Sequence, residues 1–336
     1  MKYRILGKSG LKVSVVGFGG IPVQRISKGE TKEVVLKAEE LGVNFVDSAR
    51  GYTISEELIG EALEGRRDKW ILASKSMSRD KASMAKDIET SLKNFKTNYI
   101  DLYQLHNVRT KEDLDKVLGE DGAYVALLEA KKAGKIGHIG ITSHSLDFLK
   151  YAIETEKFET IMYPYNIIEN QAEELFKRAK ELNIGVIAMK PMAGGAIENG
   201  ALALKYILQN DNVTTAIPGM ADLKEVEENT SVAHNITSLT NEEKEIADKI
   251  KSELGETFCR RCGYCAPCPQ KIDIPTMFVL SAYKERYDLA SWGEGRYFAT
   301  PARAKDCVEC GVCETKCPYD LPIRSMLKQV RKTFNE

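Results

Sequence analysis

All eight cysteines of this 336-residue chain lie between Cys259 and Cys317, and residues 1–258 contain none. They form two runs. The first run reads Cys259-x2-Cys262-x2-Cys265-x2-Cys268-Pro269, and the second run reads Cys307-x2-Cys310-x2-Cys313-x3-Cys317-Pro318. The second run has the spacing of the bacterial ferredoxin pattern, and the first run is one residue shorter in its last gap. Because soft thiolates at such short steps can surround a cubane, the runs predict two [4Fe-4S] clusters with all eight cysteines as ligands.

Two other uses of cysteine fit this pattern less well. Disulfide frameworks are typical of small secreted chains, whereas nothing here indicates export and cytosolic thiols stay reduced. Structural zinc sites usually separate two C-x2-C pairs by a dozen or more residues and do not add a proline after the last cysteine. The spacing therefore favours iron–sulfur clusters.

The two runs also look like a repeat, because each leads into an apolar helical pattern. Cys268-Pro269 precedes Ile272, Ile274, Met277 and Phe278, as Cys317-Pro318 precedes Leu321, Ile323, Met326 and Leu327. A further helical stretch spans residues 276–287, so the segment resembles the helical ferredoxins. By that resemblance one cluster takes Cys259, Cys262, Cys265 and Cys317, and the other takes Cys307, Cys310, Cys313 and Cys268.

The first 250 residues alternate short β-branched runs with amphipathic stretches, for which we expect strands and helices in turn. The expected strands cover residues 13–17, 44–48, 70–74, 99–105, 136–142, 160–165, 185–189 and 214–218. The expected helices cover residues 31–41, 55–63, 81–95, 124–133, 145–155, 171–182 and 201–210. Eight such strands over about 235 residues indicate a (β/α)8 barrel within the α/β class.

Two features refine this barrel prediction. Residues 4–13, with the turn signal Gly7-Lys8-Ser9-Gly10, look like a hairpin that plugs the bottom of the barrel. No G-x-G-x-x-G motif opens a helix, so an open dinucleotide-binding sheet is not supported. We therefore expect a barrel over residues 1–250 and a small, mainly helical ferredoxin-like domain over residues 251–336.

Polar side chains follow three neighbouring strands of the predicted barrel. Asp47 follows the second strand, Lys75 the third and His106 the fourth, and Tyr52 lies in the loop beyond Asp47. Each has an ordinary structural interpretation, as a helix cap, a rim charge or a core histidine. Chemistry in such barrels lies at the carboxyl ends of the strands, so the four together form a candidate site.

The segments that carry these four residues resemble the aldo-keto reductase family. They are Phe45-Val-Asp47-Ser-Ala-Arg-Gly-Tyr52, Leu72-Ala-Ser-Lys75 and Asp101-Leu-Tyr-Gln-Leu-His106. The likeness runs from Tyr3 to about Leu239 and includes Lys135-Ile-Gly-His-Ile-Gly140 and Tyr165-Asn166. The whole chain resembles the branch of that family with a C-terminal ferredoxin-type extension.

This resemblance implies carbonyl reduction, or alcohol oxidation, with a nicotinamide cofactor and a small-molecule substrate. Tyr52 would be the general acid that protonates the carbonyl oxygen, and Lys75 would lower the pKa of its phenol. Asp47 would hold Lys75, and His106 would orient the substrate oxygen.

The implied nucleotide contacts depart from the family pattern at several positions. Thr142-Ser143 replaces a serine–asparagine pair, Met162 a glutamine and Met189 a stacking tyrosine, although both methionines also suit barrel packing. Glu225 stands where an arginine commonly meets a 2′-phosphate, so NADH is favoured over NADPH. The full set of expected cofactor-binding residues is Thr142, Ser143, Met162, Met189, Lys190, Pro191, Gly219, Glu225, Glu228 and Asn229.

Charge and hydropathy exclude several classes of partner. With 48 basic and 49 acidic residues, the chain carries no electrostatic footprint for nucleic acid or an anionic membrane. No apolar stretch reaches the length of a membrane span or a signal peptide, and we expect a cytoplasmic protein.

Two further functions compete with a nicotinamide-dependent reductase. In one, the barrel holds another redox cofactor or docks a partner, and the clusters relay electrons to a ferredoxin-like protein. In the other, the clusters sense oxygen or iron. Hydride transfer moves two electrons together and each cluster passes one, so a flavin would couple the two, but the sequence carries no flavin signature.

Overall fold

The structure, a computed structural model, describes residues 1–336 and contains two compact units. The barrel unit comprises residues 1–166, 170–191 and 199–239. The cysteine unit comprises residues 167–169, 192–198 and 240–336, so two short segments of the first 200 residues belong to it. The assignment of residues 1–250 and 251–336 as two domains stays a prediction.

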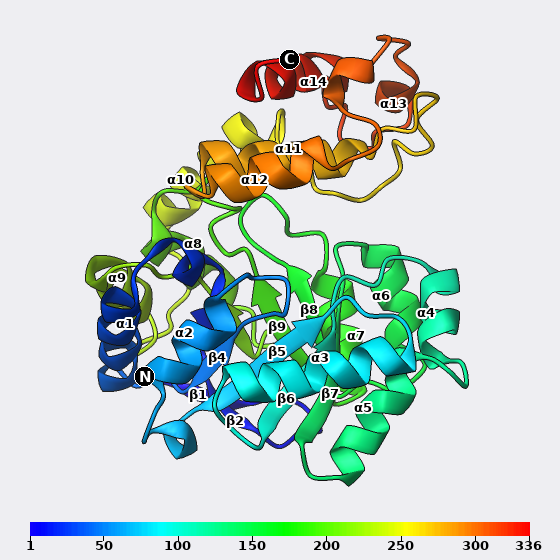
Figure 1. Ribbon diagram of the computed structural model, residues 1–336. Helices are drawn as coiled ribbons and strands as arrows, with labels where there is room; N and C mark the ends of the chain where they lie inside the picture. Colours follow the sequence, from blue (N-terminus) through cyan, green and yellow to red (C-terminus); the bar gives the residue numbers. More distant parts are fainter. The chain divides into compact units, whose positions relative to one another are not determined.

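The barrel unit is built on an eight-stranded parallel sheet, as predicted, in the order β10-β9-β8-β7-β6-β5-β4-β3 (Figure 1). Its strands are β3 (Phe18–Gly19), β4 (Phe45–Asp47), β5 (Ile71–Ser76), β6 (Ile100–Leu105), β7 (Ile136–Thr142), β8 (Thr160–Pro164), β9 (Gly185–Met189) and β10 (Thr215–Ile217). Parallel bridges from Val16 to Ala216 and from Gly19 to Gly219 join the two ends of the sheet and nearly close the barrel.

A two-stranded hairpin precedes the barrel, as predicted. It consists of β1 (Tyr3–Ile5) and β2 (Lys12–Ser14), with Arg4 opposite Val13. The expected first barrel strand at residues 13–17 is correct only in its second half: Val13 pairs within the hairpin, Val16 bridges Ala216 of β10, and the first barrel strand, β3, begins at Phe18.

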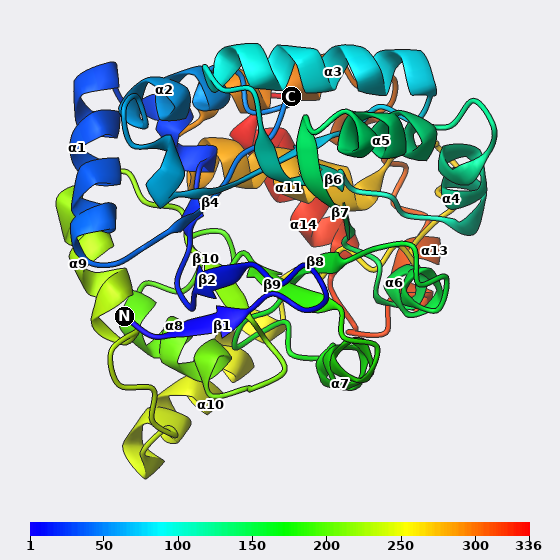
Figure 2. The ribbon, with the colours of Figure 1, turned by 90° about the horizontal axis from the view of Figure 1, so that it is seen from below.

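The hairpin closes the amino-terminal end of the barrel (Figure 2). Leu6 and Val13 lie in the same buried cluster as the inward side chains Phe45, Ala73, Leu102, Met162, Ile187 and Ile217. Gly7 bridges Ile184, the residue before β9, and the hairpin thus supplies apolar side chains to the barrel interior.

Helices cover the outside of the sheet. They are η1 (Ile21–Arg25), α1 (Lys28–Glu40), α2 (Ser55–Ala62), η2 (Arg67–Lys69), α3 (Lys81–Asn94), α4 (Lys111–Leu118), α5 (Ala123–Lys132), α6 (Leu146–Ile153), α7 (Glu173–Glu181), α8 (Gly200–Leu208) and α9 (Leu223–Ser231). Helices α4 and α9 were not expected. Helix α9 buries Asn229 and Thr230 beside Val226, so its sequence lacks a clear apolar stripe. None of the helices is both long and apolar enough to cross a membrane.

One acid-sensitive contact fastens β7 to β8. Half-burial alone raises the pKa of Glu159, but hydrogen bonds from His138 and Lys131 lower it more strongly, to about 2. A carboxylate with a depressed pKa stabilises the fold above its unfolded pKa near 4.5, and this contribution is lost as the pH falls toward 2. We expect Glu159→Gln to flatten the stability profile between these pH values by less than about 1 kcal/mol, since the Glu159 side chain is partly exposed and solvent screens its charge. Urea unfolding across that pH range measures this, and an unchanged slope would contradict it.

The cysteine unit is helical, as predicted. Its elements are α10 (Asn241–Gly255), α11 (Ile274–Glu285), α12 (Ala290–Phe298), η3 (Ala304–Asp306), α13 (Val312–Thr315) and α14 (Ile323–Thr333). Its core combines Ile272, Ile274, Met277, Leu321, Ile323 and Leu327 with the buried thiols of Cys265 and Cys313, and Phe278 and Met326 pack against it. The apolar residues that follow the two cysteine runs therefore form one core.

Candidate functional site

The strands bring Asp47, Tyr52, Lys75 and His106 (the tetrad) to one end of the barrel. Asp47 is the last residue of β4, Lys75 is the penultimate residue of β5, and His106 directly follows β6. Tyr52 lies in the loop between β4 and α2, where its amide donates to the Ala49 carbonyl. Parallel neighbouring strands end at the same edge, so these side chains converge.

Asp47 and Lys75 form a buried ion pair. The Lys75 Nζ donates to the Asp47 Oδ2 at 2.5 Å and to the Ser48 carbonyl at 2.8 Å, and Gln104 donates to the other carboxylate oxygen at 3.1 Å. Burial raises the pKa of the Asp47 carboxyl and lowers that of the Lys75 ammonium, while their mutual attraction opposes both shifts. Lys75 is thus fixed in position and has a pKa below that of a solvated lysine.

Tyr52 and His106 complete the arrangement. The Lys75 Nζ lies 4.9 Å from the centre of the Tyr52 ring. The Tyr52 and His106 rings meet edge to face, with centroids 6.0 Å apart and an interplanar angle of 89°. The structure therefore brings a phenol, an amine and an imidazole together at one end of the barrel.

The sequence analysis missed a buried carboxylate behind the tetrad. Glu56, in the first turn of α2, is 1% exposed and accepts hydrogen bonds from Ser74 at 2.6 Å and Ser91 at 2.7 Å. Its other oxygen accepts from Arg50 at 2.5 Å. Since Arg50 lies two residues before Tyr52, this network fixes the loop that carries the tyrosine. The available signal was a glutamate three residues before Ile59, on the apolar face of α2.

The ion pair makes a stability prediction. Lys75→Met leaves the Asp47 carboxylate buried without its cation, and we expect a loss of about 3–5 kcal/mol in the free energy of unfolding. Urea denaturation measures it. Lys81→Met, which breaks an exposed pair with Glu129, is the matched control and should cost less than about 1 kcal/mol. Equal losses in the two variants would contradict a buried, mutually dependent pair.

The expected nicotinamide contacts lie along β7 to β9. Thr142 ends β7 and accepts from the Asn107 amide at 2.8 Å, and the buried Ser143 donates its amide to the Met162 carbonyl at 3.2 Å. Met162 is 1% exposed within the barrel interior, and Met189 packs against the same cluster. Their packing accounts for both methionines, and their contact with a cofactor stays a prediction.

The remaining predicted contacts lie after β9 and β10. Lys190 follows β9, with Pro191 buried next to it, and its carbonyl accepts from the Asn166 side chain at 3.0 Å. After β10, Gly219 bridges Gly19, and Glu225 accepts from the Ala221 amide at 2.6 Å. Farther along α9, Glu228 accepts from the Gly200 amide at 3.1 Å, and Asn229 is buried.

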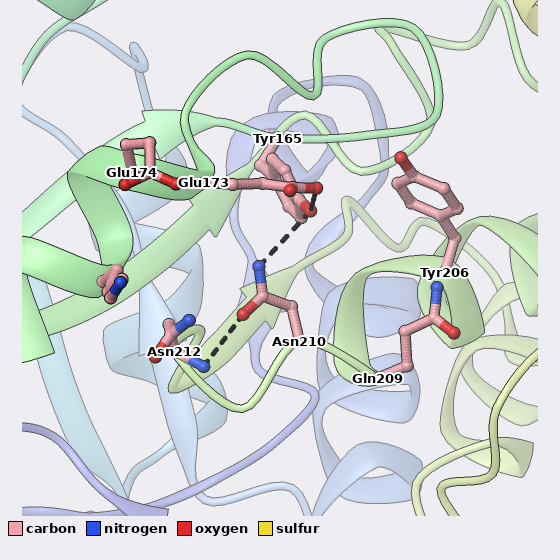
Figure 3. A pocket seen from close by; sticks show the side chains of 8 residues that line it. Tyr165, Glu173, Glu174, Tyr206, Gln209, Asn210 and Asn212 are labelled. Carbon is pink, nitrogen blue, oxygen red and sulfur yellow. Dashed lines mark hydrogen bonds between the residues drawn. The ribbon is translucent and has the colours of Figure 1, made fainter.

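A polar pocket of about 320 Å³ lies elsewhere on the barrel unit (Figure 3). Its lining includes none of the tetrad residues and consists of Tyr165, Glu173, Glu174, Lys177, Tyr206, Gln209, Asn210 and Asn212. The Tyr165 hydroxyl donates to Glu173 at 3.1 Å, and the Asn210 side chain bonds both Tyr165 and the Asn212 amide. These groups satisfy one another, so the pocket adds nothing to the candidate site.

The two cysteine runs share a backbone conformation around their first two cysteines. Arg261 and Glu309, each two residues after the first cysteine of its run, have φ of 58° and 56°. Gly263 and Gly311 follow with φ of 86° and 77°, where glycine is the residue best suited. The Arg261 and Glu309 amides each donate to the Sγ of the first cysteine at 3.4 Å. The repeat seen in the sequence is therefore a repeat of structure.

All eight thiols are free of disulfides. Burial raises the pKa of Cys259 to about 11, and burial with neighbouring thiols raises that of Cys265 to about 12. Cys317, from the second run, acts electrostatically on Cys262 of the first run. No three His, Cys, Asp or Glu side chains converge tightly enough to hold a single metal ion, and a cubane is a larger group than one ion.

Two arginines beside Cys259 are held by specific contacts. The Arg261 guanidinium donates to the Glu169 carboxylate, and the two side chains are 10% and 0% exposed. Arg260 stacks on the Tyr319 ring at 4.1 Å and donates to the Ile168 carbonyl at 3.3 Å. Ile168 and Glu169 lie in the loop that follows β8, far from the two arginines in sequence. Sequence spacing therefore could not reveal these contacts.

These features define an oxidoreductase-type barrel joined to a cysteine-rich helical unit, and comparison with known proteins agrees. Residues 15–201 match the aldo/keto reductase family, and residues 258–322 match a 4Fe-4S dicluster domain. The chain belongs to the aldo/keto reductase family.

Individual relatives support this membership. The chain is 28% identical to the uncharacterized oxidoreductase YqkF of Bacillus subtilis, over 76% of this chain and 98% of that one. It is 26% identical to the L-galactose dehydrogenase of Arabidopsis thaliana, over 74% and 93%. Among solved structures, the holo form of aldo-keto reductase AKR11C1 from Bacillus halodurans matches with a TM-score of 0.64 and 28% identity, over 74% and 96%.

Proposed function

We propose that this protein is an iron–sulfur aldo-keto reductase that reduces a small carbonyl compound, or oxidises the corresponding alcohol, with a nicotinamide cofactor. One observation carries the proposal: the Lys75 ammonium is bonded to Asp47 at 2.5 Å and lies 4.9 Å from the Tyr52 ring. A buried cation beside a phenol favours the phenolate, which is the form that remains after a proton has been donated.

The residues after β7 to β10 fit a dinucleotide. Thr142 and Ser143 supply buried polar groups at the end of β7, near the tetrad end of the barrel. The Glu225 carboxylate can accept hydrogen bonds from ribose hydroxyls, and its charge repels a 2′-phosphate. When bound, the nicotinamide supplies a hydride to the carbonyl carbon.

The protein's own residues handle the proton. The Tyr52 hydroxyl gives its proton to the carbonyl oxygen, so that hydride and proton together convert the carbonyl to an alcohol. Lys75 stabilises the resulting phenolate, and Asp47 and the Ser48 carbonyl hold Lys75 in place. His106, at the edge of the Tyr52 ring, orients the same oxygen. Positive charge is thus fixed beforehand where negative charge develops.

Nucleotide choice is set at Glu225 in this proposal. Glu225→Arg replaces a carboxylate that repels the 2′-phosphate with a guanidinium that binds it, and we expect NADPH affinity to rise at least tenfold relative to NADH, or about 1.5–3 kcal/mol. Fluorescence titration with both nucleotides measures the ratio. Lys224→Arg, which keeps the charge of the exposed neighbouring position, is the control. An unchanged ratio in Glu225→Arg would place the discrimination elsewhere.

In the cysteine unit we propose two [4Fe-4S] clusters, each held by three cysteines of one run and the proline-flanked cysteine of the other. Lys316, beside Cys317, donates to the Ala266 carbonyl of the first run at 3.4 Å, so Cys317 lies next to the first run, which supports half of this crossed arrangement. Reduced thiols persist in the cytoplasm, which is the proposed location.

An alternative is an electron-transfer protein with a ferredoxin-like partner. Cys310 is the exposed member of the eight cysteines, and Val308, two residues before it, is 61% exposed, so the second run offers an accessible edge to a redox protein.

A turnover assay separates the two functions. Purified protein with its clusters reconstituted is given NADH and a panel of aliphatic and aromatic aldehydes, and loss of the NADH absorbance is followed. Aldehyde-dependent oxidation of NADH that persists after the clusters are removed supports the reductase. Reduction of an added ferredoxin without any aldehyde turnover would favour the alternative.

A further inference from the structure

The two cysteine runs share a backbone conformation at matched positions but differ there in charge. Arg261 corresponds to Glu309, and the neutral Ala266 corresponds to Glu314. Between Cys259 and Cys265, the segment that supplies three proposed ligands of the first cluster, the charged residues are Arg260 and Arg261, giving a formal charge of +2. Between Cys307 and Cys313 the charged residue is Glu309, giving −1.

The cation of the first run is buried against a cluster ligand. Arg261 donates its amide to the Cys259 Sγ at 3.4 Å and its guanidinium to the Cys259 carbonyl at 3.3 Å. Its partner Glu169 is also buried, but the guanidinium itself lies against the Cys259 backbone. A fixed positive charge therefore lies beside this ligand, and burial protects it from screening by salt.

The second run presents carboxylates at the equivalent places. The Glu309 amide donates to the Cys307 Sγ at 3.4 Å, and Glu314 directly follows Cys313. Both carboxylates have cationic partners on α14: Glu309 bonds Lys328 at 2.8 Å, and Glu314 bonds Arg324. These pairs are more exposed than the Arg261–Glu169 pair, so they leave little net field.

We propose that Arg261, with Arg260, gives the cluster of the first run a higher reduction potential than the cluster of the second run. This inference rests on the proposed presence of two clusters. Adding an electron adds negative charge, which a fixed cation stabilises and a carboxylate opposes. A one-electron donor such as dithionite is oxidised when it reduces the cysteine unit. The electron then resides on the cluster of the first run.

Solvent exposure acts in the other direction. Water also stabilises the added charge, and Cys310 of the second run is exposed. We expect this effect to be the smaller one, since a single thiol is exposed whereas the Arg261 charge is fixed and 10% exposed.

The test is an anaerobic potentiometric titration of the full-length, reconstituted protein, with the reduced clusters followed by electron paramagnetic resonance. Two separate reduction steps are expected. Arg261→Gln should move only the higher step to lower potential, with at least a tenfold fall in the reduced-to-oxidised ratio at fixed potential, or about 59 mV for one electron. Lys249→Gln, an exposed lysine on α10, makes the same change of charge and should move neither step.

Two further variants serve as controls, the first against misfolding and the second for charge in the second run. Because Arg261→Gln leaves Glu169 buried without its cation, the double variant Arg261→Gln/Glu169→Gln restores neutrality and should shift the same step by a smaller amount. Glu309→Gln, at an exposed carboxylate paired with Lys328, should move the lower step by much less than Arg261→Gln moves the higher one.

The outcomes separate this inference from the function on which it rests. Fewer than about eight iron atoms per wild-type chain would contradict the two proposed clusters themselves. With full iron content, coincident steps, an Arg261 variant that moves neither step, or one that moves the lower step would overturn the inference.

Discussion

Replacing Tyr52 with phenylalanine is expected to lower kcat for carbonyl reduction by about 10²–10⁴-fold, the usual contribution of a positioned general acid. The variant loses one hydroxyl and keeps the ring that meets His106 edge to face and lies beside Lys75. We therefore expect the fold, and KM for the nucleotide, to be unchanged. Steady-state kinetics with circular dichroism as a folding check measures both.

Tyr151→Phe is the matched control, because Tyr151 is exposed on α6 and belongs to no part of the candidate site. It should retain full activity. If Tyr52→Phe also turned over aldehydes at the wild-type rate, Tyr52 would not be the proton donor.

Replacing Cys265 with serine is expected to have the second large effect, on metal content and stability together. Cys265 is 8% exposed within the core that contains Ile274 and Met277. Loss of this ligand should reduce the iron content from about eight atoms per chain to about four or fewer. Because metal binding contributes directly to folding in small metal-binding units, we also expect the cysteine unit to melt at lower temperature.

Iron analysis and hydrogen exchange of α11 and α14 measure these two effects. Val308→Ser is the control, since it introduces the same polar group into the second run at an exposed position without a thiol. Full iron content in Cys265→Ser would exclude this cysteine as a ligand.

Much of the fold was predictable because strand and helix periodicities are local. The bounds predicted for β7 and β9 agree with the structure to the residue, and the hairpin and the number of barrel strands were also predicted. The bounds of the first barrel strand were not, because residues 13–17 are divided between the hairpin and the barrel, where Val16 bridges Ala216. Val13 pairs with Arg4 in the hairpin, and the barrel begins at Phe18.

The candidate site was likewise predictable only in part. The tetrad could be predicted because its members end adjacent parallel strands, so sequence order gives spatial proximity. The Glu56 network and the Arg261–Glu169 pair could not, because each joins residues from separate elements, 92 positions apart in the second case. Buried charges of this kind become evident only when their partners are seen.

The proposed nicotinamide-dependent reductase is tested most directly by an anaerobic titration of the reconstituted protein with NADH and NADPH, with nucleotide fluorescence and cluster absorbance recorded together. We predict saturable binding of NADH, weaker binding of NADPH, and oxidation of the bound NADH when an aldehyde is added. Absence of binding by either nucleotide, in protein that retains its clusters and its fold, would contradict the account.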